Sequence, residues 1–350
     1  MDQWLGFGSI RYSPGVRELC CRESSRSSFR RASEDLARVG QLSISHESLR
    51  CIVETEGQHA VAQQRSGALG PTWKAEDCVL GPDHRSCVIT GADGVKVPLI
   101  TEAEKAKRRR LRKRHRKGQP PRPRIGKGSD QRYKEFKILT FYDRSHEHQY
   151  AVGTSGNHLV LGRLMRREGR KIGLDRADLA YSVSDGADWI YRQYQARLPM
   201  LKANVLDYYH VRDHVIGASH VLFGEGCAEA QTWRETICGS LLEHGAVETL
   251  AHLADQRKKV RAKGKRKALA SLIGYIGRRA DMLDYPRFIE REYEIGSGPT
   301  EAFCKTLTSR LKGPGMRWDK HNAEAIMALA SVRSSRLWQV YWKAQRKTPA

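Results

Sequence analysis

The sequence predicts a mixed α/β fold, in which a sheet of parallel and antiparallel strands carries helices on both faces. Three observations predict it. Short alternating apolar segments fill the middle of the chain, helical patterns separate the later segments, and residues 228–283 show helical patterns alone. The chain has 350 residues, 39% of them hydrophobic, which is enough to bury a sizeable core and suggests about two domains.

The N-terminal region, residues 1–57, is predicted to be helical. Ser13 followed by Pro14 is a signal for a helix start, Gly40 ends a second helix, and Ser45 can cap a third. Helices joined by a turn that contains glycine fit a helix-turn-helix that binds DNA. A plain helical hairpin fits this region nearly as well.

A linker is expected over residues 58–85, where glycine and proline recur. The predicted strands follow it, in SCVITGADGVKVPLI (86–100), EFKILTFYD (135–143), LAYSVSD (179–185) and NVLDYYH (204–210). The first of these segments would form two strands, because Asp93-Gly94 is a dipeptide typical of hairpin turns.

Helical patterns at residues 157–169 and 186–198 separate the later strands. The order is therefore three strands, helix, strand, helix, strand and then helices, which is the order of a ribonuclease-H-like fold, as in retroviral integrases. We expect a core formed by residues 86–223 and completed by residues 291–345. A helical insertion over residues 224–290 would interrupt it.

The net charge of +23 is concentrated in two runs. Residues 105–127 hold 13 Lys and Arg residues and no acid, within a predicted basic arm over residues 101–130. Residues 257–267 hold eight basic residues and no acid. Such runs suit contacts with nucleic acid phosphates, although a solubilising segment is the alternative. The predicted DNA-binding residues are Arg108, Arg109, Arg110, Arg112, Lys113, Arg114, Arg116, Lys258, Lys259, Lys305, Arg310, Lys312 and Arg317.

The sequence predicts neither a membrane span nor a secretory signal, because it has no run of 18 apolar residues and no apolar segment at its start. Its eight cysteines include no C-x-x-C pair, which argues against a zinc ribbon. Free thiols in the cytoplasm are therefore expected.

Three acidic residues occupy positions suited to phosphodiester chemistry. Asp93 ends the first predicted strand, Asp185 follows the fourth, and Glu301 lies in the first turn of a late helix. Carboxylates bind Mg²⁺, and two Mg²⁺ ions about 4 Å apart activate a nucleophile and stabilise a leaving oxygen. Each acid also has a structural alternative, such as a turn or a helical pair between Glu301 and Lys305.

The helix around Glu301 has two distinct faces. Phe303 and Leu307 are spaced by four residues and are expected to face a core. Glu301, Lys305 and Lys312 would form the other face, where a metal ion and a phosphate could meet.

The segment DYYHVRDH places Asp207, His210 and His214 on one face if it is helical. Val211 occupies the position where a zinc hydrolase of the H-E-x-x-H type needs glutamate. We therefore expect these three residues to support a nearby site rather than to bind zinc.

The chain resembles bacterial insertion-sequence transposases of the DDE class, specifically the Kra-type group, with Mutator-type transposases as distant relatives. The resemblance covers roughly residues 10–342. It rests on YSPGVRELCCRESSRSSFRRASEDLARVG with ISHESLR, and on GADGVKVPL, SDGADWI, LDYYHVRDH and, most specifically, IGSGPTEAFCKTLTSRLKGPGMRW. Relatives commonly have more residues before the first stretch, so an N-terminally shortened chain is expected.

The resemblance implies a ribonuclease-H-like core with Asp93, Asp185 and Glu301 as the catalytic, metal-binding triad. The first two would bridge a pair of Mg²⁺ ions, for which Mn²⁺ can substitute, and Glu301 would hold one ion. It also implies the helical insertion and a supporting role for Asp207 and His210, which match a Cys-or-Asp, two residues, His pattern.

The implied function is DNA transposition. Such a protein binds the terminal inverted repeats of its element, cuts by metal-activated water, and uses the freed 3′-OH to attack target DNA. A homodimer or higher oligomer on double-stranded DNA, in the nucleoid of a bacterial cytoplasm, is expected. A nuclease of the same fold and a catalytically inactive DNA-binding relative are the alternatives. An RNA-binding protein is less well supported, since no stacking motif is present.

Overall fold

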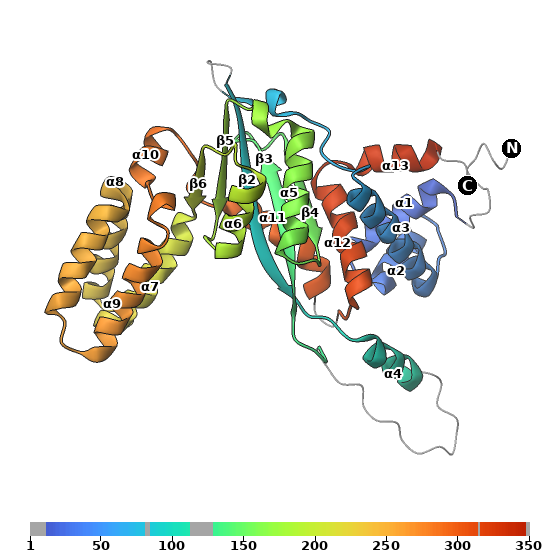
Figure 1. Ribbon diagram of the computed structural model, residues 1–350. Helices are drawn as coiled ribbons and strands as arrows, with labels where there is room; N and C mark the ends of the chain where they lie inside the picture. Colours follow the sequence, from blue (N-terminus) through green and yellow to red (C-terminus); the bar gives the residue numbers. More distant parts are fainter. Residues whose placement is uncertain (1–11, 81–84, 113–128, 314–315, 348–350) are drawn as a thin grey trace, which may run out of the picture.

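The computed structural model describes residues 12–80, 85–112, 129–313 and 316–347. At its centre is a mixed sheet with helices on both faces (Figure 1). Its strand order is β4-β3-β2-β5-β6, and these strands are β2 (Arg85–Val97), β3 (Lys134–Tyr142), β4 (Gln149–Thr154), β5 (Leu179–Ser184) and β6 (Ala203–Leu206). The short strand β1 (Val79–Leu80) pairs with β2. The predicted mixed α/β class is confirmed.

Strand β2 replaces the predicted hairpin. Asp93 and Gly94 lie inside this single strand, opposite Ile138 and Lys137 of the antiparallel strand β3. The prediction of a turn at this dipeptide was wrong. The third antiparallel strand is β4, which the sequence pattern did not predict. The first three strands of the predicted order are therefore not the observed ones, which are β2, β3 and β4, whereas the predicted helix, strand, helix and strand that follow are observed as α5, β5, α6 and β6.

The two faces of the sheet carry different helices. Successive strand residues point to opposite faces. Thr90 of β2 lies beside Tyr194 of α6 (Asp188–Arg197), whereas Gly91 faces Thr300 of α11 (Gly298–Lys312). Helices α5 (His158–Ile172) and α6 therefore cover one face and α11 covers the other, as Figure 1 shows.

The N-terminal helices are α1 (Pro14–Ser24), α2 (Phe29–Val39) and α3 (His46–Ser66). The side chains of Ser13 and Ser45 cap α1 and α3, as predicted. Helix α3 continues to Ser66, so the predicted linker over 58–85 was wrong for its first part.

The continuation of α3 has a packing reason. A Cβ atom on Gly57 would lie 2.7 Å from Cβ and O of Ala325, in α12 (Lys320–Ser334). This glycine allows the two helices to approach closely rather than ending one of them. The C-terminal helix α13 (Trp338–Lys347) also docks here, with Trp338 Nε1 donating to Glu18 at 3.0 Å. The N-terminal helices are thus packed on the β4 side of the molecule (Figure 1).

The predicted insertion is mainly helical, and Gly245 interrupts its first helix with a non-helical backbone conformation. It contains α8 (Ala228–Lys259), α9 (Lys263–Gly277), a short 3₁₀ turn at Ala280–Met282, and α10 (Tyr285–Glu290). With α7 (Tyr208–Phe223) it forms a second apolar cluster beside β5 and β6. Figure 1 shows these helices projecting from the β6 side, away from the N-terminal helices.

The basic arm begins with α4 (Glu102–Arg112). Its two ends meet, because Thr101 N donates to Asp130 Oδ1 at 2.9 Å and Ser129 Oγ donates to the carbonyl of Leu99. The arm therefore leaves the sheet after β2 and returns at the same point before β3.

Within the described parts of the chain, no helix combines the length and apolar character needed to cross a membrane.

Candidate active site

Asp93, Asp185 and Glu301 line one cleft with a volume of about 450 Å³. Strands β2 and β5 are parallel neighbours, and Gly91 pairs with Val183 in their register. Asp93 and Asp185 each lie two residues further on, which brings both carboxylates to the same end and the same face of the sheet. That face is the one that α11 covers.

Helix α11 reaches this face because Gly91 has no side chain. A Cβ atom there would lie 1.8 Å from Thr300 Oγ1. Thr300 Oγ1 instead lies 2.9 Å from Thr140 Oγ1, and Thr140 Oγ1 donates to the Gly91 carbonyl at 3.2 Å. The first turn of α11 therefore rests directly on β2 and β3, which places Glu301 beside the two aspartates.

The carboxylates influence one another electrostatically. Burial raises the pKa of Asp93, and the charges of Asp185 and Glu301 raise it further. The Cys304 thiol lies beside Asp93, and burial together with that negative charge raises the pKa of Cys304 as well. Cys304 is thus a neutral thiol, and the repulsion among the acids is of the kind that a bound cation relieves.

The donor set fits Mg²⁺, a hard ion that binds carboxylate oxygen. The oxygens of Asp93, Asp185 and Glu301 are not all within 4.8 Å of one another, since the described residues contain only one group of that compactness. A pair of ions about 4 Å apart spreads its ligands more widely than a single ion does. In this conformation the three acids do not form a compact site for a single ion.

The compact group consists of Cys78, Asp143 and His148. The carboxylate of Asp143 accepts from Ser145 Oγ at 2.7 Å and from His148 N at 3.2 Å, and it lies 2.9 Å from His148 Nδ1. These bonds close the turn between β3 and β4. Burial raises the pKa of Cys78 to about 12, so its thiol is protonated. This group is a hydrogen-bonded turn, separate from the carboxylate cleft.

Asp207 supports the cleft from behind. It is buried, caps α7 by accepting from Tyr209 N at 2.8 Å, and accepts from Ser297 N at 3.2 Å. Ser297 Oγ also bonds Asp207 and lies 3.4 Å from Glu301 Oε1. Asp207 thus ties the start of α7 to the start of α11, where Glu301 sits.

His210 and His214 lie in different surroundings. His210 lines the cleft. His214 stacks on Tyr275 of the insertion with 3.7 Å between ring centroids, and its own ring lies 6.2 Å from that of His210. Burial, followed by the charge of His210, lowers the pKa of His214. His214 therefore belongs to the packing of the insertion and is not among the residues that line the cleft.

The predicted DNA-binding residues differ in their exposure and in their contacts. Lys305 and Lys312 line the cleft. Arg108 and Arg310, also predicted to bind DNA, are only 6% and 7% exposed. Arg108 pairs with Glu104, while Arg310 packs on the rings of Phe29 and Trp318 and donates to the carbonyl of Ser24 at 3.0 Å.

The remaining predicted cations lie on α4, at the end of α8 and before α12. Arg109, Arg110, Lys258 and Lys259 are exposed and Arg317 is half-buried. Lys258 pairs with Asp255 at 2.8 Å. Arg112 ends α4, and Lys113, Arg114 and Arg116 lie outside the described residues.

Further residues that line the cleft were not predicted, namely Lys96, Ser297, Thr300 and Cys304. The last three share a signal in the sequence. Together with Glu301 they follow the spacing i, i+3, i+4, i+7, which places them on one face of a helix. The motif around Glu301 therefore contained more of the cleft than its carboxylate.

Comparison with models of known protein families gives no match, and a search of curated proteins finds no matching relative.

Proposed function

We propose that this chain is a DNA transposase of the DDE class, which cuts and joins phosphodiester bonds at the ends of an insertion sequence. The observation that carries the proposal is the convergence of Asp93, Asp185 and Glu301 on one cleft. Each comes from a different element, β2, the end of β5 and α11. Three acids gathered on rigid elements, with lysines beside them, suit the handling of a phosphodiester.

The topology supports a ribonuclease-H-like core for this activity. Three antiparallel strands are followed by two parallel strands with a helix before each, in the order β4-β3-β2-β5-β6. The helical insertion separates the second aspartate from the glutamate. That arrangement agrees with the resemblance in the sequence.

The three carboxylates would hold Mg²⁺ or Mn²⁺, which when bound supplies an activated oxygen nucleophile and stabilises the leaving oxygen. Lys96, Lys305 and Lys312 line the same cleft and would bind the substrate phosphates. Ser297, held by Asp207, orients the first turn of α11. These groups position the strand so that the attacked phosphorus lies at the acids.

The substrate in this proposal is double-stranded DNA, both the terminal inverted repeats and the target. Exposed cations on α4 and at the end of α8 would bind the backbone without reading sequence. A homodimer or higher oligomer would hold two DNA ends, in the cytoplasm of a bacterium.

The test is Asp185→Asn in a Mg²⁺-dependent assay on DNA taken from both flanks of the coding sequence. We expect the variant to bind DNA as the wild type does and to lose about a hundredfold or more in cut and joined products, because a metal-ion ligand supports several kcal/mol of charge stabilisation.

The matched control is Asp175→Asn, an exposed aspartate outside the cleft, which should leave the rate unchanged. Full activity in Asp185→Asn would remove the catalytic assignment. Cutting without joined products in the wild type would identify a nuclease instead.

A further inference from the structure

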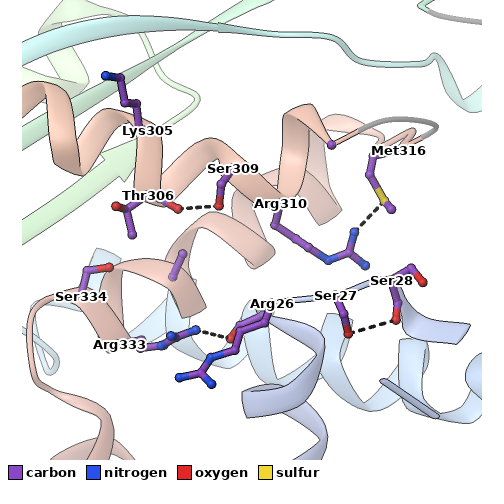
Figure 2. A pocket seen from close by; sticks show the side chains of 13 residues that line it. Arg26, Ser27, Ser28, Lys305, Thr306, Ser309, Arg310, Met316, Arg333 and Ser334 are labelled. Atoms are coloured by element: carbon purple, nitrogen blue, oxygen red, sulfur yellow. Dashed lines mark hydrogen bonds between the residues drawn. The ribbon is translucent and has the colours of Figure 1, made fainter. Parts of the chain in front are cut away.

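A second cavity adjoins the carboxylate cleft. It has a volume of about 730 Å³ and lies between the turn that joins α1 to α2 and the helices α11 and α12 (Figure 2). We name it the basic cavity, after the lining side chains of Arg26, Lys305 and Arg333, beside which lie Ser27 and Ser309.

The side chains that line the basic cavity carry a net positive charge. None of its lining residues is acidic. Arg26 and Arg333 lie side by side in Figure 2. Burial lowers the pKa of Arg333, and the charges of Arg26 and Arg22 lower it further. Neighbouring like charges of this kind are relieved by an anion.

Serine hydroxyls also line the cavity, and those of Ser27 and Ser309 donate to the carbonyls of Ser28 and Thr306. Ser27 and Ser28 come from the α1–α2 turn, and Ser309 comes from α11. Arg333 holds this turn in place, since its Nη1 donates to Ser25 Oγ at 2.8 Å. Guanidinium groups together with hydroxyls are the chemistry that binds phosphate oxygen. The cavity is therefore already shaped for such a ligand.

The basic cavity communicates with the cleft through Lys305, which lines both. Glu301, Lys305 and Ser309 follow one another along α11 at intervals of four residues, or about 6 Å. Successive phosphates of a DNA strand advance by about 3.4 Å along the helix axis. A strand with one phosphate at the carboxylates would therefore place a following phosphate in the basic cavity.

The same groove continues toward the basic arm. Ser28, Arg310 and Met316 line the basic cavity and also a third cavity of about 590 Å³. The wall of the third cavity includes Arg109 of α4 and three acids, Glu47, Glu54 and Asp319, which pair with Arg50 and Lys105. The cleft, the basic cavity and the third cavity therefore adjoin one another through shared lining residues. A row of adjoining cavities suits a polymer of phosphates better than a single small anion.

We propose that the basic cavity binds the phosphate backbone of double-stranded DNA adjacent to the bond that is cut. The N-terminal helices and the core would then both contact the same DNA strand. The position relative to the cut bond rests on the proposed function, whereas the binding of DNA backbone does not.

The test compares Arg26→Ala/Arg333→Ala with the wild type in fluorescence anisotropy on a labelled duplex over a range of salt concentrations. We expect the variant to bind the duplex more weakly than the wild type. The loss of affinity should be the same for duplexes of unrelated sequence. The slope of log affinity against log salt should become shallower by about two, because each arginine removed leaves about one phosphate without its neutralising charge.

The matched control is Arg163→Ala/Arg166→Ala, which removes two exposed arginines from α5 on the opposite face of the sheet. It should retain the affinity and the slope. The charge-conserving variant Arg26→Lys/Arg333→Lys should recover most of the binding. Thermal melts of all variants show whether each is folded.

Unchanged affinity and slope in a folded Arg26→Ala/Arg333→Ala protein would overturn the inference. Inorganic phosphate that competes as well as the duplex would also overturn it, in favour of a small phosphate ligand. Weakened binding together with a wild type that neither cuts nor joins DNA would leave the DNA contact standing and remove the proposed function. Wild-type cutting with unaltered binding in the variant would do the reverse.

Discussion

Asp93 is a carboxyl group in surroundings that oppose its ionisation. Burial comes first, and the nearby charges of Asp185 and Glu301 add to it, so its pKa lies above the ordinary 3.8. A group whose pKa is raised by folding loses stability for the protein as the pH rises through the folded pKa. At neutral pH the free protein therefore bears a cost at its own cleft, which is a common property of functional sites.

Asp93→Asn should therefore raise the melting temperature at neutral pH in the absence of divalent ions. The gain should disappear as the pH falls below 3.8, where the carboxyl is protonated in both the folded and the unfolded chain. Melting curves across this pH range measure it. The exposed Asp175→Asn provides the control and should show no such gain.

Mg²⁺ sharpens the same experiment. An ion that binds only the folded cleft stabilises the wild type by mass action. It should therefore reduce the difference in melting temperature between the wild type and Asp93→Asn. A variant that is less stable than the wild type at neutral pH without metal would contradict the electrostatic account.

The three predicted acids lie close together, although Asp93 lies within β2 and not at the end of a strand. Asp93, Asp185 and Glu301 were predicted from their places at strand ends and a helix start, and they do line one cleft. Arg310 sits in a basic pattern but packs on Phe29 and Trp318, because a guanidinium can stack on an aromatic ring as readily as it meets solvent. Its partner Phe29 lies far from it in sequence, so local pattern could not separate the two roles.

At the scale of elements, the contact between α3 and α12 depends on Gly57. Gly57→Ala would place a methyl group 2.7 Å from backbone and side chain of Ala325. We expect a loss of about 1–3 kcal/mol in the free energy of unfolding, because overpacking forces the helices apart. Denaturant unfolding measures it.

Gly239→Ala is the matched control. Gly239 lies within α8, and nothing lies within 4 Å of the Cβ that alanine would add. Alanine is the better helix former, so this variant should gain about 0.5–1 kcal/mol. Equal stabilities of the two variants would show that α3 and α12 are not in close contact.

Glycine also explains which elements the sequence could predict. Periodicity predicted β5, α6 and the helical insertion, where local pattern and tertiary role agree. It wrongly predicted a helix boundary at Gly57 and a turn at Asp93-Gly94. The conformation at both glycines depends on contacts with residues that are distant in sequence. Gly94, for example, pairs with Lys137 of β3, which lies too far along the chain to affect a local sequence pattern.

At the scale of the whole molecule, the N-terminal helices and the sheet share one apolar core. Leu49 and Val53 of α3 belong to the same buried cluster as Tyr341 and Trp342 of α13 and the residues of β3. Tyr341 Oη also donates to the carbonyl of Glu56 at 3.2 Å. The helices of the N-terminal region, residues 1–57, thus share their apolar core with the C-terminal helices.

A fragment of residues 12–70 should therefore lack a stable fold by itself. Without α12 and α13 its apolar faces have no partner, and short helices are marginal in water without tertiary packing. Circular dichroism should show much less helix per residue than these helices contribute in the full chain. A cooperative melt of the fragment would contradict this expectation and restore an independent domain.

The meeting of Thr101 with Asp130, and of Ser129 with Leu99, has a consequence for how this protein can change over time. The segment between those residues begins and ends at one point, so its length is uncoupled from the register of β2 and β3. Basic residues can therefore be added, removed or exchanged there in whole blocks, while β2 and β3 on either side keep their pairing.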